Sequence, residues 1–248
     1  DLSSAEKHLR FVINADDDLY PYVVSNSNFL LGNVFFARNQ FDSAKVYYSN
    51  YIKSAVNDDY KGFANLQIGL CLEISGNRKD AVKYFEKSSD GNSDIEEDLF
   101  AERKGNDFED RKLTTSEIRL IKISNLIKQN KLAAAKDSLE SYIVQNKITN
   151  DLKAEALLYL SQISYKQRRF QESLDFAVDC IKTEIEKEQW VHAYAYYVGA
   201  WNSFNQKKYV EAKLFLMQID NLENFDFRNS LENKIYSLQR LLPEENKK

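Results

Sequence analysis

The sequence contains few residues that interrupt a helix. Its 248 residues include only two prolines, Pro21 and Pro243, and seven glycines. Proline and glycine are the residues that most often end or break a helix. No segment alternates apolar and polar residues with the period of two that is typical of a strand. We therefore expect an all-α chain.

Residue types that carry catalysis or hold metals are also scarce. The only histidines are His8 and His192, which are too few and too far apart for a two-histidine metal site. No glycine-rich phosphate loop, nucleophile elbow or Cys-x-x-Cys motif is present. We expect Cys71 and Cys180 to be free thiols buried as small apolar residues. The sequence thus predicts a protein that is not an enzyme and uses no cofactor or metal.

The charge and hydropathy of the chain limit the classes of partner that it is expected to bind. A net charge of −4 and a pI near 5.5 give no electrostatic reason to bind nucleic acid, whose affinity for proteins comes largely from Lys and Arg. No run of 18 apolar residues exists, so we expect no membrane-spanning segment. A hydrophobic content of 43% is ample for a continuous core. These features favour a protein or peptide as the partner.

A short phrase returns at a nearly fixed interval along the chain. A glycine lies twelve residues before an alanine, and an aromatic residue lies four residues after that alanine. The two clear copies are Gly32, Ala44 and Tyr48, then Gly69, Ala81 and Phe85, and weaker copies are centred on Ala135, Ser173 and Ala212. We interpret the two small residues as the point where the helices of a hairpin cross closely. Such repeats predict stacked hairpins, because one hairpin alone cannot bury its apolar face.

The phrase resembles the consensus of the tetratricopeptide repeat (TPR) family. The family has Leu-Gly in the first helix, matched by Leu31-Gly32 and Ile68-Gly69, and Gly-x-Tyr-x-x-Ala-x-x-x-Phe in the second, matched around Ala81. The step between anchors is 37 to 39 residues, apart from one of 54, whereas the family repeat has about 34 residues and a closing proline. The resemblance implies an all-α, right-handed TPR-like solenoid of about five helical hairpins with a closing C-terminal helix.

We expect one solenoid over residues 1–248. A partial repeat covers residues 1–20, a helical insertion covers 91–113, and a closing helix covers 227–242. The full repeats are predicted at residues 25–60, 62–90, 115–148, 152–185 and 190–225. Because the chain opens on Asp1 inside the partial repeat, we also expect it to be part of a longer protein, which leaves its compartment open.

The insertion is predicted to be an ordered helix from about Asp94 to Gly105. Ser93 and Glu96 have the spacing of a capping box. A buried apolar stripe is expected at Ile95, Leu99 and Phe100, and the cap of the following helix at Thr115 or Ser116. The calcium-loop spacing Asp-x-Asp-x-Asp-Gly is absent from this acidic segment, so we interpret its carboxylates as helix-stabilising.

A narrower resemblance lies in the same segment, where residues 98–104 read Asp-Leu-Phe-Ala-Glu-Arg-Lys. This phrase is similar to one in the tetratricopeptide repeat protein 39 family and its relatives, the fungal inclusion-body clearance proteins. There too the phrase follows repeat helices and precedes a new helix, although residues 118–127 here lack the aromatics of that family. The resemblance implies a non-enzymatic helical-repeat adaptor, some of whose relatives work at lipid droplets or mitochondrial surfaces.

The first helix of each repeat is expected to line the concave side of the solenoid. The predicted partner-binding residues are Phe29, Asn33, Phe36, Leu66, Leu70, Tyr165, Tyr197, Trp201 and Phe204. Aromatic and apolar side chains in a groove are suited to anchoring a peptide or helix. A register shifted by one residue would instead place about half of them in the core. TPR domains that clamp a carboxylate use Lys where this chain has Phe29, which disfavours that function.

Our leading hypothesis is a non-enzymatic protein–protein interaction module that holds a partner peptide or helix in this concave groove. The alternative is a structural segment of a larger repeat protein. In that case the groove would be filled by the protein's own chain or, through homo-oligomerisation, by a second copy.

Overall fold

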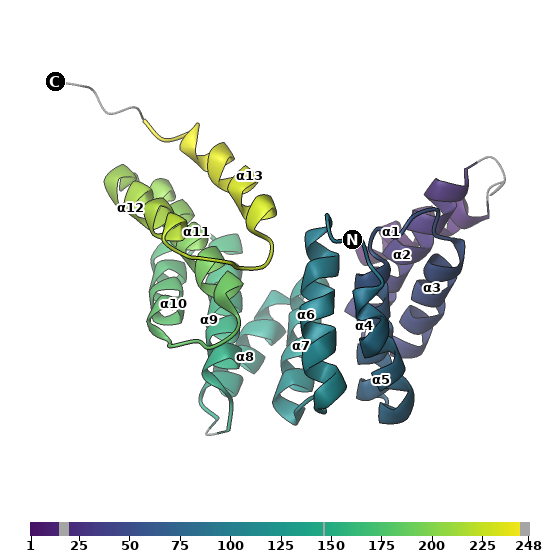
Figure 1. The fold of residues 1–248 in the computed structure, drawn as a ribbon. Coiled ribbons are helices and arrows are strands. Elements are labelled where there is room, and N and C mark those ends of the chain that lie inside the picture. Colours follow the sequence, from purple (N-terminus) through teal and green to yellow (C-terminus); the bar gives the residue numbers. More distant parts are fainter. Residues whose placement is uncertain (15–19, 146, 244–248) are drawn as a thin grey trace. The chain divides into compact units, whose positions relative to one another are not determined.

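The computed structural model describes residues 1–14, 20–145 and 147–243, and it confirms the all-α fold. These residues form thirteen α-helices and one short 3-10 helix, without a strand (Figure 1). The chain forms two compact units, unit 1 over Asp1–Lys131 and unit 2 over Leu132–Lys248. Each unit has its own set of packed helices.

Unit 1 is built from two helical hairpins with further helices packed on them. α2 pairs with α3 and α4 pairs with α5, while α3 also packs on α4, α1 on α2, and α6 on both α4 and α5. The helices are α1 (Leu2–Ile13), α2 (Pro21–Ala37), α3 (Phe41–Ser54), α4 (Lys61–Ile74), α5 (Arg78–Glu86), the 3-10 helix η1 (Lys87–Ser89), α6 (Glu96–Asp110) and α7 (Thr115–Lys128). Tyr48, Leu66 and Phe85 are among the fully buried side chains of its core.

Unit 2 repeats the hairpin arrangement. α9 pairs with α10 and α11 with α12, α10 also packs on α11, and α8 and α13 pack on α9 and α11 respectively. Its helices are α8 (Leu132–Ile143), α9 (Asn150–Lys166), α10 (Phe170–Lys182), α11 (Gln189–Asn205), α12 (Tyr209–Asp220) and α13 (Arg228–Gln239). α9 and α11 also contact each other, so the first helices of these two hairpins lie side by side.

The same turn follows the first helix in every repeat. One residue of each turn has a positive φ angle of 58° to 85°, and it lies five positions before the small anchor of its repeat. Its N–H donates to the carbonyl three residues back, and the next N–H donates to the carbonyl five residues back, as in a Schellman motif. The five residues are Asn39, Gly76, Asn130, Arg168 and Lys207. This shared geometry shows that the spacing in the sequence is a structural repeat.

The small residues of the phrase are buried, as the predicted close packing requires. All five anchors are 0% exposed: Ala44, Ala81, Ala135, Ser173 and Ala212. A Cβ added to Gly32 would lie 2.6 Å from the ring of Tyr48, and one added to Gly69 would lie 2.5 Å from the ring of Phe85. The aromatic ring therefore occupies the space that a side chain on the glycine would need.

The repeat around Ser173 uses hydrogen bonds at the same crossing. Ser161 and Ser173 each donate from Oγ to the other's carbonyl at 2.7 Å, and Asn202 Nδ2 donates to Ser173 Oγ at 2.7 Å. All three residues are 0% exposed. Serine is small enough for the crossing, and because its buried hydroxyl has these partners it avoids the cost of an unsatisfied polar group.

Replacing Ala81 with leucine is expected to lower the free energy of unfolding by roughly 1–3 kcal/mol, because the larger side chain overpacks the crossing. Urea denaturation followed by circular dichroism measures the change. Lys79→Leu introduces the same side chain at an exposed position of the same helix and serves as the control. Equal midpoints for the two variants would show that Ala81 does not lie at a tight crossing.

The insertion is an α-helix, α6, but the predicted cap and buried face were wrong in detail. Its N-cap residue is Ile95, without a side-chain cap, so the Ser93 and Glu96 capping box does not form. Leu99 is 46% exposed, while Ile95 and Phe100 are half-buried. The buried face is instead formed by Asp98, Ala101, Gly105 and Phe108. The cap of α7 is Thr114, one residue before the predicted pair, in a capping box with Glu117.

A buried carboxylate explains the orientation of α6. Asp98, which is 3% exposed, accepts hydrogen bonds from the backbone N–H of Phe63 at 2.8 Å and of Asn92 at 2.9 Å. Phe63 is the third residue of α4, whose own N-cap residue, Tyr60, provides no side-chain cap. Asp98 therefore caps α4 from another helix, since the first N–H groups of a helix lack partners within it.

Asp98 should also give the protein a distinct pH dependence. Burial raises the pKa of this carboxyl, although the N–H groups of Phe63 and Asn92 act in the opposite direction. The folded chain then holds the proton more tightly than the unfolded chain, so this group's contribution to stability falls as the pH rises from the usual carboxyl pKa through the raised one.

Asp98→Asn is expected to remove this pH dependence and to cost about 1–3 kcal/mol, because an amide has one acceptor oxygen for two N–H donors. The advantage of the wild type over the variant should narrow as the pH rises. Urea midpoints of both proteins from acidic to neutral pH measure it. A constant difference across the series would contradict the raised pKa.

Candidate functional site

The nine residues predicted to bind a partner fall into two groups. Unit 1 contains Phe29, Asn33, Phe36, Leu66 and Leu70, and unit 2 contains Tyr165, Tyr197, Trp201 and Phe204.

Three residues of the first group belong to the core. Phe36, Leu66 and Leu70 are 6%, 1% and 7% exposed, which corrects the register inferred from the sequence. α4 packs against α3, α5 and α6, and every residue from 64 to 72 is buried. The position of α6 was not predictable from the repeat, and it helps to cover the helix that was expected to line a groove.

Phe36 is buried for a different reason, because α7 packs on α2. Asn125 Nδ2 donates to the carbonyl of Phe36 at 2.8 Å, and Gln129 Nε2 donates to the carbonyl of Ala37 at 2.7 Å. Lys128 Nζ lies 5.9 Å from the centre of the Phe36 ring. The two hydrogen bonds satisfy carbonyls in the last turn of α2, which lack partners within the helix.

The other two residues of unit 1 are half-buried and make internal contacts. The Phe29 ring contacts four aromatic rings, with centroid distances of 5.1 Å to Tyr51 and 5.3 Å to Tyr60. Asn33 Oδ1 accepts a hydrogen bond of 2.7 Å from the hydroxyl of Tyr48, which is a fully buried residue. Asn33 thus satisfies a core hydroxyl, and Phe29 completes an aromatic cluster.

The four residues of unit 2 come together on the two first helices. Tyr165 is on α9, and Tyr197, Trp201 and Phe204 are on α11; we call these four residues the aromatic strip. The centre of the Trp201 ring lies 6.5 Å from that of Tyr165, 6.5 Å from that of Tyr197 and 5.5 Å from that of Phe204. All four side chains are half-buried. Each is therefore partly packed against the protein and partly accessible to solvent.

Two flanking aromatics, Phe170 and Tyr209, were missed from the sequence. Their rings lie 5.8 Å from those of Tyr165 and Phe204 respectively. Both occupy the first position of the second helix, as Phe41 does in unit 1, where it lies 5.3 Å from Phe36. An aromatic pair across the turn between the two helices is therefore a repeated feature of these hairpins. It could have been identified in the sequence, because an aromatic residue recurs three residues before the anchor.

Trp201 is not part of this repeated pair. The corresponding position in the other repeats, eleven residues before the anchor, is occupied by Asn33, Leu70, Ser124 and Gln162. Asn205 Nδ2 donates to the Trp201 carbonyl at 2.8 Å and to the Tyr165 hydroxyl at 3.3 Å, which links the two helices beneath the strip. The indole is thus an addition to the repeat, held by rings on three sides.

The titratable residues singled out in the sequence have structural surroundings. Burial raises the pKa of both Cys71 and Cys180 to about 12, so neither thiol is an activated nucleophile. Burial lowers the pKa of His192, whose Nε2 lies 3.0 Å from the carbonyl of Thr183. Within residues 1–14, 20–145 and 147–243, no group of three or more His, Cys, Asp or Glu side chains is placed to hold a metal ion.

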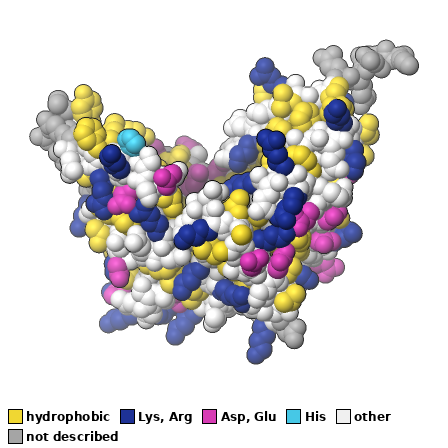
Figure 2. Space-filling view, turned by 180° about the vertical axis from the view of Figure 1, so that it is seen from behind, with side chains coloured by type: hydrophobic (Ala, Val, Ile, Leu, Met, Phe, Trp, Pro, Cys, Tyr) yellow, Lys and Arg dark blue, Asp and Glu magenta, His cyan; other side chains and the backbone are white. Residues whose placement is uncertain are grey.

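The surface has mixed charge. On the face shown in Figure 2, Lys and Arg side chains are spread among acidic and hydrophobic ones. None of the helices in the described part of the chain is both long and apolar enough to cross a membrane.

Comparisons with known proteins find similar solved structures but no matching family. No family model matches the sequence, and no curated protein sequence does so either. Among solved structures, the chain is similar to YrrB, described as a TPR protein with an unusual peptide-binding site, at 14% identity and a TM-score of 0.40 over 85% of this chain and 91% of that one. It is similar to PilF of Pseudomonas aeruginosa at 11% identity and a TM-score of 0.40, over 89% and 93%. With its five repeated turns and close crossings, the chain has an all-α, TPR-like repeat fold.

Proposed function

We propose that this chain is a non-enzymatic protein-interaction module and that the aromatic strip of unit 2 holds a peptide or helix of a partner protein. The observation that carries the proposal is Trp201, a half-buried indole bracketed by three aromatic rings. An aromatic side chain that is already ordered loses little conformational entropy on binding, and Trp and Tyr dominate the energetics of protein interfaces.

The chemistry of the strip suits an apolar side chain flanked by backbone polar groups. Trp201 and Phe204 offer apolar rings, whereas Tyr165 and Tyr197 add a hydroxyl each to the same cluster. Because a tyrosine hydroxyl both donates and accepts hydrogen bonds, it can pair with the backbone of a bound segment. We infer that a partner inserts a large apolar residue beside Trp201.

A second reading is a structural segment that associates with its own chain or with a second copy. It is favoured by a separate apolar face on α12, where Val210, Leu214 and Met217 are 73%, 53% and 59% exposed and follow one side of the helix. Sedimentation velocity across a concentration series distinguishes the readings, because self-association raises the sedimentation coefficient with concentration.

The phrase at residues 98–104 resembles the tetratricopeptide repeat protein 39 family. It supports an adaptor role only because it helps to form the repeat fold, and not because it forms a binding site. Asp98 caps α4, and Ala101 is 0% exposed. Because these residues make internal contacts, we infer that the phrase specifies how α6 packs and is not a ligand site.

Affinity capture followed by mass spectrometry tests the proposed function. The wild type is compared with Tyr165→Ala/Trp201→Ala and with a control, Val210→Ala/Met217→Ala, which removes exposed apolar side chains outside the strip. We expect the strip variant to lose partners that the control retains, with thermal stability checked for all three. Recovery of the same partners by the strip variant would exclude the strip as the binding surface.

A further inference from the structure

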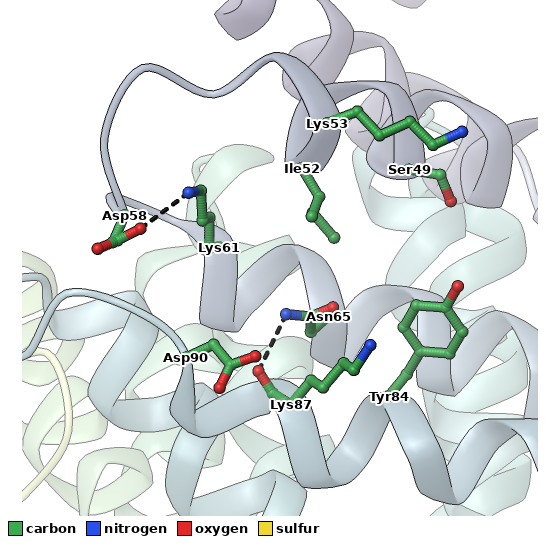
Figure 3. Close-up of a pocket in the computed structure, with 9 residues that line it drawn as sticks. All are labelled: Ser49, Ile52, Lys53, Asp58, Lys61, Asn65, Tyr84, Lys87 and Asp90. Atoms are coloured by element: carbon green, nitrogen blue, oxygen red, sulfur yellow. Dashed lines mark hydrogen bonds and ion pairs between the residues drawn. The ribbon is translucent and has the colours of Figure 1, made fainter.

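A pocket of about 400 Å³ lies in unit 1, among residues of α3, α4 and the end of α5 (Figure 3). Its volume falls within the range of small-molecule sites, about 300–1,000 Å³. None of the residues predicted to bind a partner lines it. The pocket is therefore distinct from the aromatic strip, which belongs to unit 2.

Three lysines from different segments line the pocket: Lys53 of α3, Lys61 of α4 and Lys87 of η1. Lys61 is paired with Asp58 at 2.8 Å. Within the described part of the chain, Lys53 and Lys87 form no ion pair, and Lys87 Nζ lies 6.0 Å from the centre of the Tyr84 ring. Two ammonium groups at the pocket thus lack a carboxylate partner.

The ammonium groups of Lys53 and Lys87 lie away from the carboxylates of the pocket. In Figure 3 the polar ends of Ser49, Lys53, Tyr84 and Lys87 lie to the right of Asp58 and Asp90, with the Lys53 ammonium at the top and the Lys87 ammonium below it, while Lys61 lies beside Asp58 on the left. The four polar ends on the right combine two cations with two hydroxyl donors.

The backbone of Lys87 is held in place by α4. Asn65, which is 3% exposed, donates from Nδ2 to the Lys87 carbonyl at 2.9 Å. Tyr84 precedes Lys87 by three residues on the same helical segment, so its ring and the Lys87 ammonium are positioned together. Ile52 adds an apolar side chain to the lining. The pocket therefore has cationic and hydroxyl-bearing side chains next to apolar surface.

We propose that this pocket binds a phosphate monoester, with Lys53 and Lys87 neutralising the phosphoryl group and Ser49 and Tyr84 donating hydrogen bonds to it. A phosphate monoester carries a charge of about −1.5 to −2 at neutral pH. Two ammonium groups therefore balance its charge more closely than they would balance the single negative charge of a carboxylate. Lysine binds phosphate as a point charge and needs no fixed bidentate geometry. The organic part of the ligand contacts Ile52 and the Tyr84 ring.

The same chemistry is found in a small metabolite and in a phosphorylated side chain of a peptide. Phenyl phosphate and a short phosphotyrosine peptide are the two probes, since they share the ring and the phosphoryl group. Tighter binding of the peptide identifies a phosphorylated protein as the source, and equal affinities identify a small molecule.

Amide chemical shifts in ¹H–¹⁵N spectra of the full chain test the proposal. Titration with phenyl phosphate is expected to move the amides of residues 49–53 and 84–90 saturably. Lys53→Gln/Lys87→Gln should weaken binding by about tenfold or more, whereas Lys79→Gln/Lys83→Gln, which removes the same charge from α5 outside the pocket, should leave it unchanged. Lys53→Arg/Lys87→Arg, which keeps both charges, should retain most of the binding.

Two results would overturn the proposal. One is an absence of saturable shifts around the pocket in the wild type. The other is equal weakening in the two glutamine variants, which would indicate attraction by net charge alone.

Discussion

Replacing Phe85 with alanine is expected to lower the free energy of unfolding by about 3–5 kcal/mol, the usual cost of removing a fully buried aromatic ring. Phe85 is 0% exposed. Its ring fills the space beside Gly69, lies 5.5 Å from the ring of Phe108 in α6, and has the Arg78 guanidinium at 5.8 Å. One side chain therefore joins both helices of its hairpin to the inserted helix. Because Gly69 has no side chain, it cannot fill the cavity that the loss of the ring would leave.

Urea denaturation of the wild type, Phe85→Ala and Glu86→Ala measures this effect. Glu86 is the exposed neighbour on the same helix, and surface substitutions of this kind usually stay within about 0.5 kcal/mol. Phe85→Leu should fall between the wild type and Phe85→Ala, because it retains part of the buried surface. A Phe85→Ala midpoint as high as that of Glu86→Ala would show that the ring does not join these helices.

The repeat itself was predictable from the sequence because its determinants are local. Close crossings require small residues, and an adjacent ring requires an aromatic at a fixed distance along the helix, so Gly69, Ala81 and Phe85 could be placed from their spacing alone. The positive φ angles at Arg168 and Lys207 were less visible, since these residue types rarely adopt that conformation. There the repeated fold overrides local preference.

The burial of the predicted groove residues was not predictable in the same way. Leu66 and Leu70 occupy the expected helix, but α6 packs over that helix. The packing of α6 depends on Asp98 reaching the N-terminus of α4, a contact across 35 residues that no periodic pattern indicates. From local sequence, an apolar stripe at Ile95, Leu99 and Phe100 was the plausible interpretation. In the structure the helix instead directs Asp98 toward α4 and leaves Leu99 exposed.

The four aromatic residues of unit 2 lie near one another because α9 and α11 follow regular repeats without an insertion between them. Tyr165 precedes Ser173 by eight residues and Phe204 precedes Ala212 by eight, so both fall on the same face.

Replacing Trp201 with alanine is expected to weaken partner binding by about thirtyfold or more, equivalent to about 2 kcal/mol, the loss typical of a central aromatic anchor. The indole contributes the largest ring of the strip, and its neighbours Tyr165, Tyr197 and Phe204 hold it in place before binding. Trp201→Phe retains a ring and should lose less.

Trp190→Ala is the matched control, since it removes the same side chain from the same helix outside the strip. Trp190 packs against Tyr194 and Phe227, so its removal tests whether any loss of a tryptophan from α11 disturbs binding. Circular dichroism and thermal denaturation establish that both variants retain the helical fold.

The dissociation constant of one peptide, selected for binding to the wild type, tests the central claim most directly when it is measured by isothermal titration calorimetry for all three proteins. The proposed function predicts that Trp201→Ala weakens this peptide by about thirtyfold or more, while Trp190→Ala stays within about threefold of the wild type. Equal affinity of Trp201→Ala and the wild type would contradict the assignment of the aromatic strip as the partner-binding surface.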